Sequence, residues 1–92
     1  MITWDDAKRR SNLAKHGLDF AEAEAVLDGP MTTEEDARVA YGEQRINALG
    51  LLHSAVIAMT YTERNGDLHI ISLRKATRYE AQAFARGIFG QP

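Results

Sequence analysis

The sequence has no cysteine among its 92 residues. Disulfide bonds and thiolate metal ligands are therefore excluded, and nothing in the chain requires an oxidising compartment. The sequence also lacks an apolar run close to the roughly 20 residues that a membrane-spanning helix needs. Its first residues have neither the basic start nor the apolar stretch of a signal peptide. We therefore expect a cytoplasmic protein that does not use a membrane.

An excess of positive charge is missing as well, because the formal net charge is −2. This balance argues against a general nucleic-acid binder. The distribution is uneven, however: acidic residues gather between Glu22 and Asp36, whereas Lys and Arg cluster near the start and from Arg64 onward. With 45% hydrophobic residues, the chain is long enough for one core, so we expect a single domain over residues 1–92.

The first third of the chain predicts one short strand and two helices. Ile2 to Trp4 reads as the strand, and Asp5-Asp6 favour a helix start because carboxylates are stabilised at the positive end of the helix dipole. Gly17 is expected to end this helix after His16. Asp19, followed by Glu22, forms a capping box that opens the second helix, which Asp28-Gly29-Pro30 ends.

The remainder predicts an edge strand, a meander and a final helix. The polar segment from Met31 to about Glu43 is expected to hold a short edge strand and a loop around Tyr41-Gly42. Asn65-Gly66 is a strong signal for a two-residue hairpin turn, and His53-Ser54 is expected to form the turn before it. Thr77 and Glu80 make a second capping box, which opens the last helix. The three strands of the antiparallel meander are Arg45 to Leu52, Ala55 to Glu63 and Leu68 to Arg74.

These elements predict an α+β fold. A small antiparallel sheet would have the two N-terminal helices and the C-terminal helix packed on one face. The turn at Asn65-Gly66 predicts that Arg64 pairs with Asp67, Thr62 with His69 and Thr60 with Ile71. The other turn predicts that Arg45 pairs with Thr62 and Asn47 with Thr60. What we call the polar face then carries Arg45, Asn47, Thr60, Thr62, Arg64 and His69, and the core face carries Ile46, Ala48, Leu52, Ile57, Met59, Tyr61, Leu68 and Ile70.

The polar face brings two arginines and a histidine together, which repulsion disfavours unless an anion binds there. An ordinary solvated face is the competing interpretation. A phosphate is one anion that the two guanidinium groups could hold, and chemistry on it would also need groups that accept and donate protons. The catalytic candidates are Arg64 for charge, His69 for proton transfer and Glu80 as a base, although its capping position explains Glu80 without a catalytic role.

Other basic and polar residues are candidates for holding RNA. One stripe of the first helix is mostly polar. A basic cluster lies where the last strand meets the last helix, whose N-terminus offers free N–H groups to a phosphate. Arg74 falls on the core-face parity, so we expect it either to pair with a buried acid or to emerge at the sheet edge. If this surface binds RNA, single-stranded RNA is the expected ligand because its bases and 2′-OH groups are accessible. The RNA-binding candidates are Lys8, Asn12, Lys15, Arg45, Arg74, Lys75 and Arg78.

Two other functions compete with this hypothesis. The same cationic face could bind an acidic segment of a protein partner without chemistry. A metal-dependent nuclease could instead use the acids Glu34, Glu35 and Asp36. The three histidines show no ligand spacing such as HxxxH, so we expect neither a metal nor another cofactor.

Several segments, in order, resemble the BrnT family of type II toxins over nearly the whole chain. They are Trp4-Asp5-Asp6-Ala7-Lys8, Asn12 to Phe20, Ala23 to Asp28, Gly42-Glu43-Gln44-Arg45 with Gly50, Tyr61-Thr62-Glu63-Arg64, and Ile70 to Thr77.

The resemblance implies a RelE-like fold and a ribonuclease activity that blocks translation. It also implies neutralisation by a BrnA-type antitoxin with a ribbon-helix-helix domain, in a hetero-oligomer such as a 2:2 complex that binds promoter DNA through the antitoxin. The chain departs from the family at His69, where Arg is common, and at Leu73, where Ala is common. Loss of that Arg could weaken catalysis, or His69 could take over as the proton-transfer group.

Overall fold

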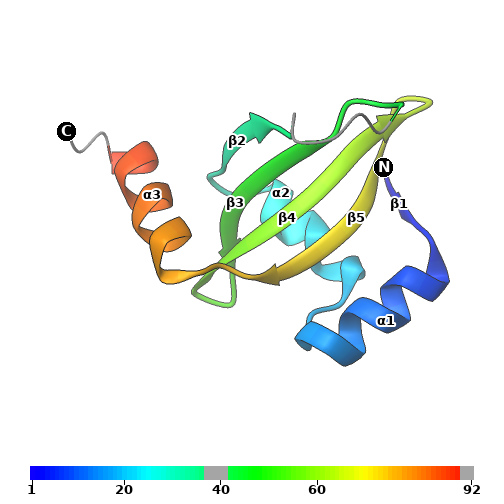
Figure 1. Ribbon diagram of the computed structural model, residues 1–92, viewed down its shortest axis with the longest axis horizontal. Helices are drawn as coiled ribbons and strands as arrows, with labels where there is room; N and C mark the ends of the chain where they lie inside the picture. The colour runs from blue at the N-terminus through cyan, green and yellow to red at the C-terminus, as the bar shows by residue number, and fades with distance from the viewer. Residues whose placement is uncertain (37–41, 90–92) are drawn as a thin grey trace.

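A five-stranded sheet forms the centre of the molecule (Figure 1). The structure is a computed structural model that describes residues 1–36 and 42–89. The strand order is β1-β5-β4-β3-β2, in which β1 runs parallel to β5 and the other neighbours are antiparallel. The α+β class is confirmed, but the predicted small antiparallel sheet is wrong because the sheet is mixed and larger. The strands are β1 (Ile2–Trp4), β2 (Thr32–Glu35), β3 (Ile46–Leu52), β4 (Ala55–Arg64) and β5 (Asp67–Lys75).

The helix boundaries follow the predicted capping signals. The Asp5 side chain accepts a hydrogen bond from the Ala7 amide at the start of α1 (Asp6–His16), and Gly17 ends this helix with φ 71°. The predicted capping box at Asp19 is present, although it opens a 3₁₀ turn (Phe20–Glu22) that leads into the short helix α2 (Ala23–Leu27). Thr77 and Glu80 exchange hydrogen bonds at the start of α3 (Arg78–Phe89).

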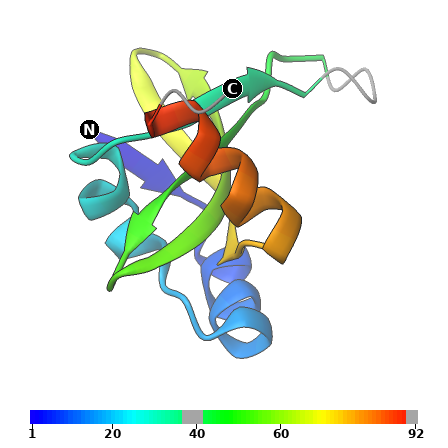
Figure 2. The same cartoon turned by 90° about the vertical axis from the view of Figure 1, so that its left-hand side faces the viewer.

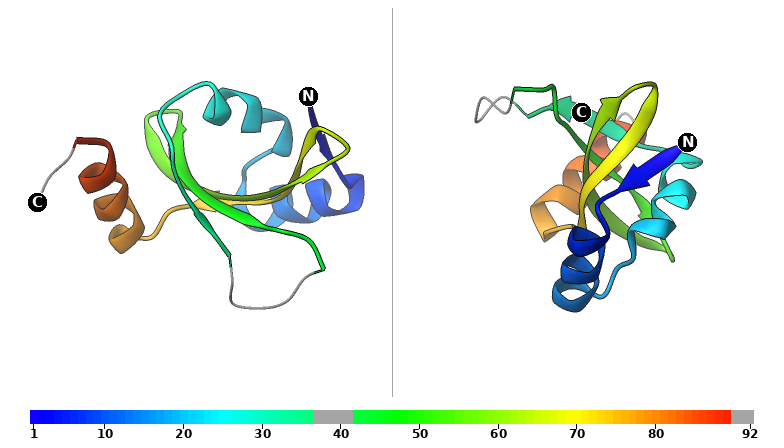
Figure 3. Two further views of the ribbon diagram at one scale, coloured as in Figure 1. Left: turned by 90° about the horizontal axis from the view of Figure 1, so that it is seen from above. Right: turned by 90° about the vertical axis from the view of Figure 1, so that its right-hand side faces the viewer.

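The hydrophobic core lies between the core face of the sheet and the N-terminal helices (Figure 3). Gly50 allows this close packing, because a Cβ atom there would lie 2.7 Å from Cγ1 of Val26. The buried residues of β3 and β4, together with Ile70 of β5, confirm the predicted core face, but Leu73, which the predicted register placed on the opposite face, is buried as well. The core consists of Phe20, Ala23, Val26, Ala48, Leu52, Ile57, Met59, Ile70 and Leu73.

The C-terminal helix packs on the other side of the sheet, so the prediction of all helices on one face is wrong. Figure 2 shows α2 and α3 on opposite sides of the strands. A groove of about 820 Å³ lies between α3 and the polar face, lined by Asn47, Thr60 and Ser72 from the sheet and Tyr79 and Glu80 from the helix. The short connection after β5 and the ion pair of Arg74 with Glu80 bring α3 to this side.

The pairing of β4 with β5 contains one extra residue on β5. Arg64 pairs with Asp67 and Thr62 with His69, as predicted. The predicted pair of Thr60 with Ile71 is wrong, because Thr60 pairs with Ser72 and leaves Ile71 in a β-bulge. A bulge shifts the alternation of side chains by one position. Arg74, whose predicted parity placed it on the core face, therefore lies on the polar face.

The pairing of β3 with β4 follows the register predicted from the sequence. Asn47 lies opposite Thr60, as predicted, and Thr60 Oγ1 donates to Asn47 Oδ1 at 2.8 Å. Arg45 precedes β3 and is not part of that register, which begins with Ile46 opposite Tyr61. The edge strand predicted after Met31 is β2. Tyr41, in the loop predicted there, lies outside the described residues.

Asn12 fastens α1 to β5. Its side chain donates to the Leu73 carbonyl at 2.7 Å and to the Leu18 carbonyl at 3.2 Å, and it accepts from the Leu73 amide at 3.2 Å. β1 ends opposite Ile70, so no described strand extends along this side of β5 at Leu73. The Asn12 amide therefore serves in place of a strand neighbour. Asn12 is buried, which contradicts its predicted place on an RNA-facing stripe.

Replacing Asn12 with alanine should destabilise the protein by about 2–4 kcal/mol, because two buried backbone groups lose their partners. Urea unfolding would measure the loss. Ser11→Ala, on the exposed neighbouring position of α1, is the control and should change stability by less than about 0.5 kcal/mol. An Asn12→Ala variant as stable as the control would contradict this role of the side chain.

Ser54→Gly should stabilise the protein by about 0.5–1 kcal/mol, since an L-residue with a left-handed backbone is disfavoured relative to glycine. The two turn residues His53 and Ser54 have φ values of 52° and 65°. The midpoint of thermal unfolding would report the change. Ser54→Ala keeps the Cβ atom and should bring no gain; an equal gain in both variants would point to the hydroxyl instead of the backbone.

Candidate active site

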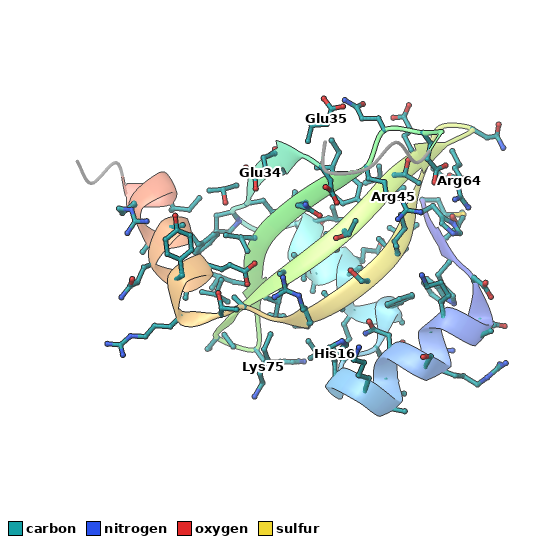
Figure 4. The ribbon with its side chains drawn as sticks, viewed as in Figure 1. His16, Glu34, Glu35, Arg45, Arg64 and Lys75 are labelled. Carbon is teal, nitrogen blue, oxygen red and sulfur yellow. The ribbon has the colours of Figure 1, made fainter. Side chains whose placement is uncertain are left out.

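A cluster of charged side chains lies at one end of the polar face, where β4 ends. Arg64 Nε lies 3.1 Å from Glu43 Oε1, and Arg64 Nη2 lies 2.9 Å from Glu43 Oε2, so the two groups form a bidentate ion pair. The Nε atom of Arg45 is 3.9 Å from the same carboxylate. Figure 4 shows Arg45 and Arg64 close together, far from Lys75. Two guanidinium groups therefore share one internal carboxylate.

The segment before β3 brings Glu43 into this position. Gly42 has φ 78°, a left-handed backbone that turns the chain toward the sheet. Gln44 then accepts a hydrogen bond from the Thr62 hydroxyl. Thr62 is only 1% exposed, although it belongs to the polar face. This contact anchors the segment that carries Glu43 and Arg45.

His69 lies one strand away from Arg64's strand, on β5. Its Nδ1 atom is 2.9 Å from Oγ1 of Thr3, its partner on β1. Burial is the largest cause that lowers the pKa of His69 below its usual 6.5, and the positive charges of Arg64 and Lys8 lower it further. The negative charges of Glu43 and Asp5 act in the opposite direction.

These interactions show which predicted residues meet. Arg64, Arg45, His69 and Lys8 come together from β4, the segment before β3, β5 and α1. The arrangement combines an imidazole whose neutral form is favoured with the positive charges of Arg64 and Lys8. Such a surface is suited to transferring a proton next to a bound phosphate.

Glu80 and Arg74 form a separate pair, at the other end of β5. Arg74 donates to both carboxylate oxygens of Glu80, at 2.8 and 3.0 Å, and the Thr77 amide donates to the same carboxylate. These contacts, above all the one with Arg74, lower the pKa of Glu80 to about 2. His69 and Arg74 are five positions apart along β5, roughly 15 Å. The structure thus does not bring Glu80 to the Arg64 cluster.

The other predicted RNA-binding residues are dispersed. Lys15, Lys75 and Arg78 are exposed at the end of α1, the end of β5 and the start of α3. Of the alternative metal-binding acids, Glu34 and Glu35 are exposed on the edge strand β2, and Asp36 is buried after it. Within residues 1–36 and 42–89, no group of three His, Asp or Glu side chains has the arrangement of a metal site.

Two neighbours of the cluster are not among the residues singled out from the sequence. Thr3 could have been found from the pairing of β1 with β5, but a three-residue strand gives no register signal of its own. The other neighbour is Glu43, which precedes the polar-face strand residues in the sequence but was given no role at the site. Its position between two arginines depends on the turn at Gly42, which the sequence alone does not specify.

A comparison with models of protein families shows which family this chain belongs to. Residues 4–80 match the family described as ribonuclease toxin, BrnT, of type II toxin-antitoxin systems. The chain belongs to the BrnT family. Membership of the BrnT family implies a ribonuclease toxin with an RNA target and an antitoxin partner. No curated protein matches the sequence. None of the helices in the described ranges is both long and apolar enough to cross a membrane.

The BrnT match ends at Glu80 and so includes the whole Arg64 cluster. It also includes the Arg74–Glu80 pair, while most of α3 lies beyond it. The match therefore covers strands β2 to β5 and the N-terminal helices, and of β1 it includes only Trp4.

We predict that His69 titrates below pH 6.5, and that its pKa rises in Arg64→Gln and falls further in Glu43→Gln. The signs follow because Arg64 repels the added proton and Glu43 attracts it. NMR titration of the imidazole would measure all three values. Since the native state then binds fewer protons than the unfolded state, the contribution of His69 to stability decreases as the pH falls from about 6.5. Opposite signs in the two variants would contradict the arrangement.

Proposed function

We propose that this BrnT-family chain is a metal-independent endoribonuclease that cleaves single-stranded RNA at the Arg64 cluster and thereby inhibits translation. The observation that supports it best is the position of Arg64, which is 47% exposed and lies beside Glu43, Arg45 and His69. An exposed guanidinium can meet a phosphate, and a neighbouring neutral imidazole can take a proton from the adjacent 2′-OH.

Each residue has a distinct part in the proposed reaction. His69 takes the proton of the 2′-OH, whose oxygen attacks phosphorus. Arg64 stabilises the negative charge that develops on the phosphoryl oxygens. Arg45 and Lys8 hold flanking phosphates: Arg45 lies beside the carboxylate that Arg64 contacts, and the charge of Lys8 acts on His69. Glu80 has no part in this step, since its carboxylate is already bound by Arg74.

Glu43 competes with an RNA phosphate for the guanidinium of Arg64. Its carboxylate occupies the two donors of Arg64 that a phosphate would use. Binding of RNA therefore requires Arg64 to turn away from Glu43, or to share its donors between the two anions. The carboxylate that is released lies within the site, where it can orient the guanidinium of Arg45.

The antitoxin partner belongs to the same proposal. We propose a BrnA-type protein with a ribbon-helix-helix domain, joined to this chain in a 2:2 complex that contacts promoter DNA through the antitoxin. The net charge of −2 favours contact with DNA through the partner instead of this chain. A RelE-like fold and action in the cytoplasm, where translation takes place, are parts of the same hypothesis.

Arg64→Ala should abolish growth arrest on expression and lower the rate of RNA cleavage by at least about 10²-fold, because one charge-stabilising donor is lost. Arg86→Ala, an exposed arginine on α3, is the matched control and should keep full activity. Thermal unfolding would confirm that both variants fold. Unchanged toxicity of a folded Arg64→Ala protein would refute the assignment of this residue.

Purified protein should cleave RNA equally well with and without EDTA. Loss of cleavage in EDTA would favour the metal-dependent alternative that uses acidic residues. If micromolar protein leaves RNA intact under both conditions, the cationic surface is a binding module and the enzymatic proposal fails.

A further inference from the structure

Thr3 is held in a fixed position relative to the His69 imidazole. The parallel pairing of β1 with β5 places Thr3 opposite His69, between the pairs Ile2 with Leu68 and Trp4 with Ile70. The Leu68 amide donates to the Met1 carbonyl at 3.0 Å and extends this ladder. Both side chains are half-buried, and the hydroxyl is 2.9 Å from Nδ1. Backbone pairing therefore sets the contact.

The second ring nitrogen of His69, Nε2, is left for another partner. Within the described part of the chain, no side chain or backbone group forms a hydrogen bond with it. Because a histidine with one engaged nitrogen presents the other, the choice of tautomer decides whether Nε2 carries a proton or a lone pair.

We propose that Thr3 is a positioning residue: its hydroxyl accepts a hydrogen bond from Nδ1–H of His69 and so keeps the lone pair of Nε2 available as the proton acceptor. This inference rests on the proposed ribonuclease function. It names a residue that acts on the reaction only through His69.

The direction of the hydrogen bond follows from what the reaction requires. In the tautomer with Nδ1–H, the bond to Thr3 is present before Nε2 takes a proton and remains present afterwards, because both nitrogens of the imidazolium are donors. The ring therefore does not have to turn during the step. In the opposite tautomer, Thr3 would donate to Nδ1 and Nε2 would already hold a proton, so it could not accept another.

The proton balance is simple. Nε2 takes the 2′-OH proton, the 2′ oxygen forms a bond to phosphorus, and the bond from phosphorus to the 5′ oxygen breaks. The leaving 5′ oxygen takes a proton from water, and the imidazolium later returns its proton to solvent. The products are a 2′,3′-cyclic phosphate and a 5′-hydroxyl end, with no change of oxidation state.

Charged groups from three elements act on the ring. Arg64 from β4 and Lys8 from α1 disfavour its protonation, whereas Glu43 before β3 and Asp5 at the start of α1 favour it. Thr3 contributes a neutral acceptor for Nδ1–H, which favours the imidazolium. Removing the hydroxyl should therefore move the protonation of His69 to lower pH.

The test compares Thr3→Val, which removes the hydroxyl but keeps the branched shape suited to a strand, with Thr3→Ser, which keeps the hydroxyl. NMR of the imidazole ¹⁵N nuclei, in protein without RNA, reports the tautomer directly. We expect Nδ1–H in the native protein and in Thr3→Ser, and loss of this preference in Thr3→Val. A native protein whose Nδ1 is unprotonated, or a Thr3→Val protein with an unchanged ring spectrum, would overturn the proposal.

Cleavage kinetics form the second part of the test. Thr3→Val should lower kcat/KM by about tenfold, as loss of a group that orients an imidazole does, and should shift the acid limb of the pH profile to lower pH. Thr3→Ser should restore both. If the tautomer is as expected but none of the proteins cleaves RNA, the proposed function fails and with it the role of Nε2. If cleavage occurs and Thr3→Val keeps the native pH profile, only the role of Thr3 is wrong.

Discussion

The β-bulge at Ile71 is the constraint on which the arrangement of this sheet depends. On one side of it, Ile70 faces the core and His69 the polar face; on the other side, Leu73 faces the core and Arg74 the polar face. Without the extra residue, the parity of one half of β5 would be reversed, and Arg74 would point into the hydrophobic core. The bulge thus allows a single strand to serve the Arg64 cluster and the attachment of α3.

Much of this fold could be predicted because its signals are local. Capping boxes, a glycine after α1 and a two-residue turn at Asn65-Gly66 each act within a few residues, and each is present. The bulge has no comparable signal, since Ile71 and its neighbours are all compatible with a regular strand. The side of the sheet chosen by α3 also depends on distant contacts. Those two features account for the errors in the predicted position of Arg74 and of α3.

The candidate site shows the same division between local and distant information. Alternation along β4 and β5 was sufficient to predict that Arg64 and His69 share a face. Asn12 looked like part of a polar helix stripe, yet it binds the backbone of Leu73, which is 61 positions away in the sequence. Glu43 and Thr3 reach the cluster through a loop and a parallel pairing that side-chain periodicity does not describe.

The bidentate contact between Glu43 and Arg64 has a consequence for selectivity. The Glu43 carboxylate resembles a phosphate in charge and in bidentate geometry, so it competes with any polyanion for the donors of Arg64. A ligand that offers phosphate alone gains little by displacing it. Under the proposed ribonuclease mechanism, a polymer that adds a 2′-hydroxyl contact at His69 recovers the loss, whereas DNA, which lacks that hydroxyl, does not.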